Sequence, residues 1–242
     1  MNGTLRTRSN PCLWIVAAAS FLVLSQSSLA QIPDTRTVIQ GVDASVKNRI
    51  DRIADYSVTE HYVVFRGKDE HPAAEMVVQT VYRKETGKSY TILSQKGSSI
   101  WRNEVLGTLL DNEKKMSQPG NVETALINSS NYEMKLDANP RQGLNGRDCL
   151  VLDITPRRNS EYLFRGKLWV DSHDFEIVQL KGTASKSATF LARAAEVSRQ
   201  YAEIEGLPMA THAEAISGSA LLGQTVVKID YMNYKIDLSG SR

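Results

Sequence analysis

The feature that most constrains the fold of this chain is the alternation of apolar and polar residues, which recurs along most of the sequence after Tyr56. It begins in the run TEHYVVF (59–65), which is rich in β-branched and aromatic residues. A period of two over such lengths is typical of strands that bury one face. We therefore expect strands at 57–66, 75–84, 88–95, 132–138, 150–155, 164–171, 175–183, 195–205, 209–217 and 224–236.

Two regions show a helical period instead. Val42, Val46, Ile50 and Ile53 recur at helical spacing after an irregular lead-in over 31–41, and Asp43 is placed to cap this helix. The stretch 98–117 carries its apolar residues roughly on one side and stops before Pro119-Gly120, which predicts a second helix. Residues 121–128 predict a third, shorter one.

Short polar connections join most of these segments, so neighbouring strands should be antiparallel. No Pro/Gly/Ser-rich linker divides the chain, which predicts one domain over 31–242. Long strands twist and coil, and helices with one apolar stripe can cover the concave side. The expected fold is mainly β (α+β), an incomplete, strongly curved antiparallel β-barrel with helices covering the concave apolar face. Periodicity leaves open whether side chains fill that interior or a ligand does.

Residues 1–30 are interpreted as a cleavable signal peptide. Arg6 and Arg8 precede an apolar run over 11–24, and the small residues Ser28 and Ala30 follow it. The run is shorter than the roughly 20 residues that a spanning helix needs. We expect cleavage near Ala30 and a soluble periplasmic protein.

The charge balance limits the classes of partner, and the cysteine content limits the disulfides that the chain can form. Removal of residues 1–30 leaves 27 basic and 27 acidic residues, and this balance argues against nucleic acid as a partner. Cys149 is then the remaining cysteine, so no intramolecular disulfide is expected. We interpret Cys149 as a buried small apolar residue rather than a nucleophile.

No catalytic motif emerges from the sequence. His61, His71, His173 and His212 show no metal-ligand spacing, and neither GxSxG nor GxGxxG is present. We therefore expect no enzyme activity, no metal and no cofactor.

An apolar cavity is the remaining kind of site. Its candidate lining residues are Tyr82, Leu93, Trp101, Leu109, Met134, Leu152, Ile154, Phe164, Leu168 and Val170. The alternative for each is ordinary core packing. The phase of Trp169 sets it with Arg165 and Lys167, either at the rim or on the convex face.

Three consecutive strand candidates carry a family resemblance. These are 147–156 (RDCLVLDITP), 164–171 (FRGKLWVD) and 175–182 (FEIVQLKG), together with the Leu221-Leu222-Gly223 turn and the strand that follows it. They resemble the outer-membrane lipoprotein-sorting protein family, the LolA-like periplasmic carriers. The resemblance implies a half-open barrel that binds acyl chains in the periplasm as a carrier or chaperone in outer-membrane biogenesis.

The leading hypothesis is accordingly a non-catalytic periplasmic carrier for a lipid or lipoprotein acyl chain. Its expected partners are those acyl chains, an envelope protein, and a membrane surface in transient contact. The alternative is an envelope sensor or protein-interaction module on the same scaffold. A secreted hydrolase, the third class, requires titratable groups clustered in a pocket.

Overall fold

A computed structural model describes residues 1, 3, 33–186, 195–219 and 223–240 of the chain. The predicted signal peptide and the Leu221-Leu222 part of the predicted turn lie outside the described residues. Among the described residues, no helix combines the length and the apolar character needed to cross a membrane.

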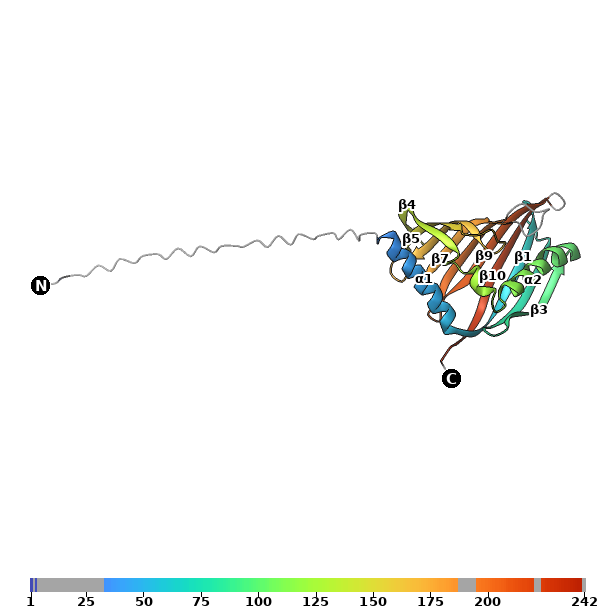
Figure 1. Ribbon diagram of the computed structural model, residues 1–242, viewed down its shortest axis with the longest axis horizontal. Helices are drawn as coiled ribbons and strands as arrows, with labels where there is room; N and C mark the ends of the chain where they lie inside the picture. Colours follow the sequence, from blue (N-terminus) through green and yellow to red (C-terminus); the bar gives the residue numbers. More distant parts are fainter. Residues whose placement is uncertain (2, 4–32, 187–194, 220–222, 241–242) are drawn as a thin grey trace. The chain divides into compact units, whose positions relative to one another are not determined.

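The described chain forms one antiparallel sheet (Figure 1). Its strands are β1 (Ile53–Arg66), β2 (Ala74–Arg83), β3 (Gly87–Gly97), β4 (Tyr132–Leu144), β5 (Arg147–Pro156), β6 (Phe164–Asp171), β7 (Ile177–Ala184), β8 (Glu196–Ile204), β9 (Leu207–Ser219) and β10 (Gly223–Leu238). They lie in the order β3-β2-β1-β10-β9-β8-β7-β6-β5-β4. All the strands expected from the alternation are present, and their antiparallel pairing is confirmed.

The sheet is open, with β3 at one edge and β4 at the other. The ladder between β1 and β10 runs from Ile53 opposite Leu238 to Arg66 opposite Thr225. Gly166 of β6 lies opposite Gly182 of β7, and a Cβ added at Gly182 would be 2.6 Å from the Arg165 carbonyl oxygen. This close approach of the two backbones requires glycine. The incomplete antiparallel barrel predicted from the sequence is confirmed.

Helix α1 (Thr35–Arg52) begins earlier than predicted. Asp34 is its N-cap and accepts hydrogen bonds from the backbone N–H groups of Arg36 and Thr37. The prediction that Asp43 caps the helix was wrong. Asp43 lies inside α1, and its carboxylate accepts hydrogen bonds from the Ser129 N–H and hydroxyl at 2.8 and 2.5 Å. Asp43 instead accepts from the hydrogen-bond donors of Ser129 in the turn before β4.

The helix expected over 98–117 consists of two parts. A π-helical stretch, η1 (Trp101–Gly107), runs directly into α2 (Thr108–Met116). The short third helix is α3 (Val122–Ala125).

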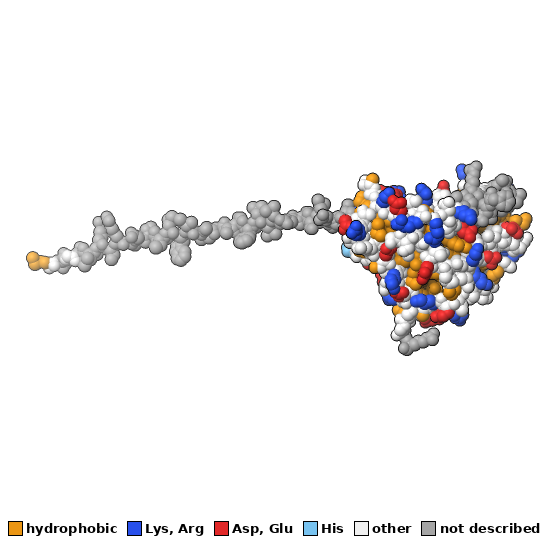
Figure 2. Space-filling view, in the orientation of Figure 1, with side chains coloured by type: hydrophobic (Ala, Val, Ile, Leu, Met, Phe, Trp, Pro, Cys, Tyr) orange, Lys and Arg blue, Asp and Glu red, His pale blue; other side chains and the backbone are white. Residues whose placement is uncertain are grey.

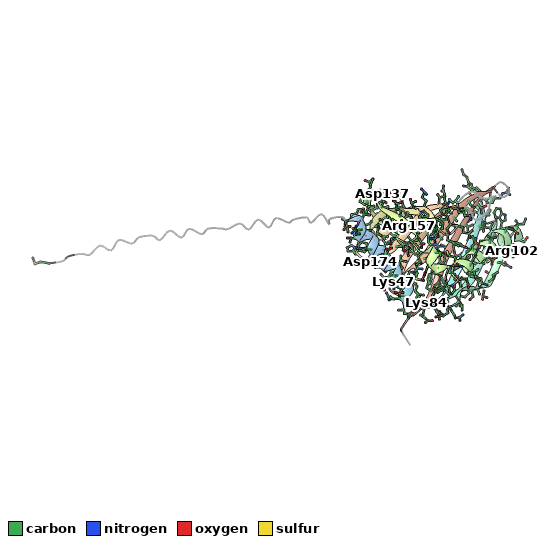
Figure 3. All side chains as sticks on the ribbon, in the orientation of Figure 1. Lys47, Lys84, Arg102, Asp137, Arg157 and Asp174 are labelled. Atoms are coloured by element: carbon green, nitrogen blue, oxygen red, sulfur yellow. The ribbon has the colours of Figure 1, made fainter. Side chains whose placement is uncertain are left out.

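Helices α1 and α2 lie against the same face of the sheet (Figure 1). We call the face of the sheet that α1 and α2 cover the inner face. At the end of α1, Lys84 Nζ donates a hydrogen bond to the Ile50 carbonyl at 3.1 Å (Figure 3). Residues that lie opposite one another from β1 through β10, β9 and β8 to β7 share this inner face. The alternation predicted a buried face for each strand, and β8 departs from this prediction because none of its residues is buried.

Candidate functional site

The inner face carries two separate apolar clusters. The α1 cluster joins α1 to strands β4–β7 and contains Val38, Val42, Tyr132, Met134, Leu150, Leu152, Ile154, Leu163, Leu168, Val170, Ile177 and Leu180. The α2 cluster joins η1 and α2 to the other half of the sheet and contains Val58, Tyr62, Val64, Ala74, Met76, Val78, Leu106, Leu110, Ala213, Val227, Ile229 and Tyr231. Each helix therefore covers its own half.

The sequence-predicted cavity residues divide between these regions. Met134, Leu152, Ile154, Leu168 and Val170 are all buried in the α1 cluster, and the half-buried Phe164 packs against it.

The remaining four do not join them. Trp101 and Leu109 are half-buried against the α2 cluster. Tyr82 packs at the far end of β1, where its ring stacks on Tyr56 with centroids 5.0 Å apart. Leu93 on the edge strand β3 is 57% exposed. Their role in ligand binding stays a prediction.

Between the two helix-covered halves lies the part of the inner face formed by β8 and β9. No residue of β8 is buried. Three β8 side chains face inward, since Arg199 lies opposite Leu180 and Ala213, both of which are buried in the clusters. We call the half-buried inward residues here the central strip: Val197, Arg199, Tyr201, Ala210 and Ala215. Figure 2 shows hydrophobic side chains gathered in the middle of the face that α1 and α2 flank.

A cluster of ionisable side chains borders the central strip beneath α2. We call it the buried charge cluster: Glu60 of β1, Lys88 of β3, Glu113 of α2 and Arg199 of β8. Lys88 Nζ pairs with Glu113 Oε2 and lies 3.9 Å from Glu60 Oε1. Arg199 Nη2 lies 3.6 Å from Glu113 Oε1. Three elements, α2, β3 and β8, thus meet at the Glu113 carboxylate, and Lys88 links it to Glu60 of β1.

The two carboxyl groups in this cluster are held in opposite ways. Burial raises the pKa of Glu60, a side chain with no exposed surface, and Lys88 offsets this only in part. Burial would also raise the pKa of Glu113, but Lys88 and Arg199 together lower it. Glu113 is therefore the carboxylate that the two cations stabilise.

Tyrosine hydroxyls surround the carboxyl groups. The Tyr62 hydroxyl donates to Glu60 Oε2. Burial, with Glu113 as the next cause, raises the pKa of Tyr62 well above its ordinary value, and burial does the same for Tyr231. Both remain neutral hydrogen-bond donors at physiological pH.

Nucleophilic chemistry has little support among the described residues. Cys149 is fully buried, and burial raises the pKa of its thiol to about 11, so it remains a thiol at neutral pH. His71 and His173 are exposed. The described residues hold no group of three or more His, Cys, Asp or Glu side chains placed to bind a metal.

The other two histidines lie on the outer face of the sheet. In register, His61 and His212 lie on either side of Asp230, and His212 Nδ1 is 2.7 Å from Asp230 Oδ1. Trp169 is also on the outer face, where its Nε1 donates to Gln142 Oε1 at 3.0 Å. The phase of Trp169 in the sequence had left its position open between rim and convex face.

Sequence analysis missed the buried charge cluster, although a signal for it is present. Glu60 stands between Val58 and Tyr62 in the inward phase of β1, and Arg199 stands between Val197 and Tyr201 in β8. A charged residue in the apolar phase of a strand indicates a buried partner. The partner itself, Glu113, could not be assigned without the tertiary fold.

Comparison with known proteins places these features in context. No protein-family model and no curated protein matches the sequence. Among solved structures, the chain is similar to a LolA superfamily protein from Nitrosomonas europaea, with a TM-score of 0.45 and 14% identity over 84% of this chain and 93% of that one. It is also similar to a DUF1329 family protein from Desulfovibrio piger, with a TM-score of 0.44 and 15% identity over 84% and 95% of the two chains.

A third similar structure is an outer membrane lipoprotein-sorting protein domain from Vibrio parahaemolyticus, with a TM-score of 0.43 and 11% identity over 83% of this chain and 92% of that one. The strand motifs of the sequence resemble the same group of proteins for which two of these similar structures are named. At such identities, we argue function from this chain's own residues.

Proposed function

We propose that this protein is a non-catalytic periplasmic carrier that binds the acyl chain of a lipid or lipoprotein over the central strip. The observation that carries the proposal is the incomplete cover of the inner face. Helices α1 and α2 bury their own halves of the sheet, whereas Val197 and Ala215 between them are only half-buried. As part of the same proposal, residues 1–30 direct export and are then removed.

The energetics suit an acyl chain. Each methylene group taken out of water contributes about 0.8 kcal/mol, so about ten of them contribute about 8 kcal/mol before ordering costs are subtracted. Ala210 and Ala215 present small side chains on this part of the inner face. No catalytic residue is required for binding of this kind.

Binding of a fluorescent fatty acid tests the proposal. We expect saturable binding to the wild-type protein, and native mass spectrometry of the purified protein should show a bound amphiphile. Ala215→Trp extends a large ring over the strip from between Val197 and Val227 and should weaken binding by about tenfold or more, since it displaces methylene contacts.

The matched control is Thr183→Trp, which adds the same ring to an exposed outer-face position on β7. It should leave the affinity unchanged, and thermal unfolding should show both variants folded. Absence of saturable binding by the wild-type protein would rule out the carrier function.

A sensor or protein-interaction module is the second candidate, and the exposed apolar side chains near the β3 edge favour it. Ile92, Leu93 and Ile100 are 49%, 57% and 58% exposed. An edge strand with apolar side chains can pair with a strand of another protein. Recovery of one stoichiometric envelope protein with no lipid would favour this function, and Leu93→Lys should then abolish the interaction.

A further inference from the structure

Arg199 is the one charged member of the central strip, and its position is unusual for an arginine. It lies on the inner face of β8, directly opposite Leu180 of the α1 cluster on one side and Ala213 of the α2 cluster on the other. Its side chain is 31% exposed, whereas that of Lys88 is only 13% exposed. Of the two cations in the buried charge cluster, Arg199 is the one that reaches the open strip.

The hydrogen-bonding capacity of Arg199 is only partly used within the described residues. A guanidinium group has five N–H donors. Glu113 is its carboxylate partner, but at 3.6 Å the contact is an ion pair without a close hydrogen bond. The Tyr201 side chain is a further hydrogen-bond partner of the guanidinium. The Arg199 Nε atom is buried and has no hydrogen-bond partner among the described residues. Lys88 already takes the short contact with Glu113, so Arg199 retains donors for a further acceptor.

We propose that Arg199 binds the anionic headgroup of the amphiphile, a carboxylate or a phosphate, while the acyl chain lies over Val197 and Ala215. This inference rests on the proposed function and names its substrate class. The planar fork of an arginine matches both anions with two parallel hydrogen bonds. Apolar surroundings strengthen such a contact relative to water.

The charge of the surrounding groups leaves room for one anion. Glu113 lies between two cations, Lys88 and Arg199. Burial favours the neutral form of Glu60, which raises its pKa. Lys88 contacts the carboxyl groups of both Glu60 and Glu113, so Arg199 is the cation of the cluster that can pair with an anion over the strip.

A pair of probes that differ only in the headgroup charge tests this inference. A dansyl-labelled fatty acid and its methyl ester are titrated into the wild-type protein, Arg199→Gln and Arg199→Lys. The wild-type protein should bind the acid more tightly than the ester. Arg199→Gln should bind the acid about tenfold more weakly, the size expected for loss of a hydrogen bond between charged groups. It should bind the ester as the wild-type protein does, and Arg199→Lys should recover part of the affinity for the acid.

The control is Arg165→Gln, which removes an exposed cation from the outer face of β6 and should change neither affinity. Competition by lysophosphatidic acid and by unlabelled fatty acid then distinguishes a phosphate headgroup from a carboxylate.

Three results would overturn the inference. Equal affinity of the wild-type protein for acid and ester, with no effect of Arg199→Gln, would reject the headgroup contact and leave the carrier function standing. Equal weakening of both probes by Arg199→Gln would show that Arg199 only supports the fold. Failure of both probes to bind the wild-type protein would reject the carrier function itself.

Discussion

The two halves of the inner face are built on different principles. The α1 cluster consists of apolar side chains together with Tyr132, whose hydroxyl accepts a hydrogen bond from the Phe164 N–H. The α2 half combines a similar apolar cluster with Glu60, Lys88 and Glu113. Apolar packing is tolerant of partner and direction, whereas buried ions need their specific partners. The difference indicates that apolar burial holds α1 against the sheet, whereas α2 is held by apolar burial and by ion pairs.

Removal of the Glu113 carboxylate in the α2 half should cause the largest loss of stability. Glu113→Ala leaves Lys88 buried beside Glu60 alone and frees Arg199 from its ion pair. We expect the free energy of unfolding, measured by urea denaturation, to fall by about 3–5 kcal/mol. Asp111→Ala, an exposed position on the same helix, should change it by less than about 0.5 kcal/mol. A loss below about 1 kcal/mol for Glu113→Ala would mean that the charges do not hold α2.

Truncation in the α1 half should cost slightly less and behave differently with pH. Leu152 is fully buried in the α1 cluster, and Leu152→Ala should lower the free energy of unfolding by about 3 kcal/mol through lost transfer energy and a cavity. That loss should be the same at acid and neutral pH, since Leu152 does not titrate.

The loss caused by Glu113→Ala should instead shrink in acid. Because the folded-state pKa of Glu113 is lowered, its contribution is present above its ordinary value of 4.5 and disappears as the pH falls through the lowered value. If both variants showed the same pH profile in urea denaturation, the contrast between the two halves would be lost.

The smallest expected effect separates the two carboxyl groups within the α2 half. The pKa of Glu60 is raised, so its neutral form is favoured in the folded protein and its contribution is lost as the pH rises through the folded value. Glu60→Gln, which cannot ionise, should therefore gain stability relative to the wild-type protein as the pH rises above 4.5. Urea midpoints across a pH series measure this. A relative loss with rising pH would show that ionised Glu60 is a stabilising partner of Lys88.

Much of this fold could be predicted from local pattern, because a strand that buries one face shows alternating apolar and polar residues in its sequence. Gly87 in the turn before Lys88 has a φ of +77°, a backbone conformation that favours glycine. The start of α1 was not. Thr35, Thr37 and Gly41 have low helix propensity, and the docking of Gly41 against the Phe175 ring overrides it.

The candidate site was harder to predict, since it depends on which strands become neighbours. Leu93, Tyr82 and Leu152 were all predicted to line one apolar cavity. In the sheet, Leu93 lies on the edge strand β3, Tyr82 stacks on Tyr56, and Leu152 lies in the α1 cluster. The position of Arg199 depends on its neighbours Leu180, Ala213 and Glu113. No local period in the sequence connects these residues with Arg199.

The pairing of β1 with β10 has a consequence for the order of assembly. These strands are the first and the last of the sheet along the chain, yet they lie side by side, third and fourth from the β3 edge. Their ladder closes the longest loop in the molecule, a step that entropy makes slow. A chain that emerges from the ribosome N-terminus first therefore holds β1 without this neighbour until β10 has followed.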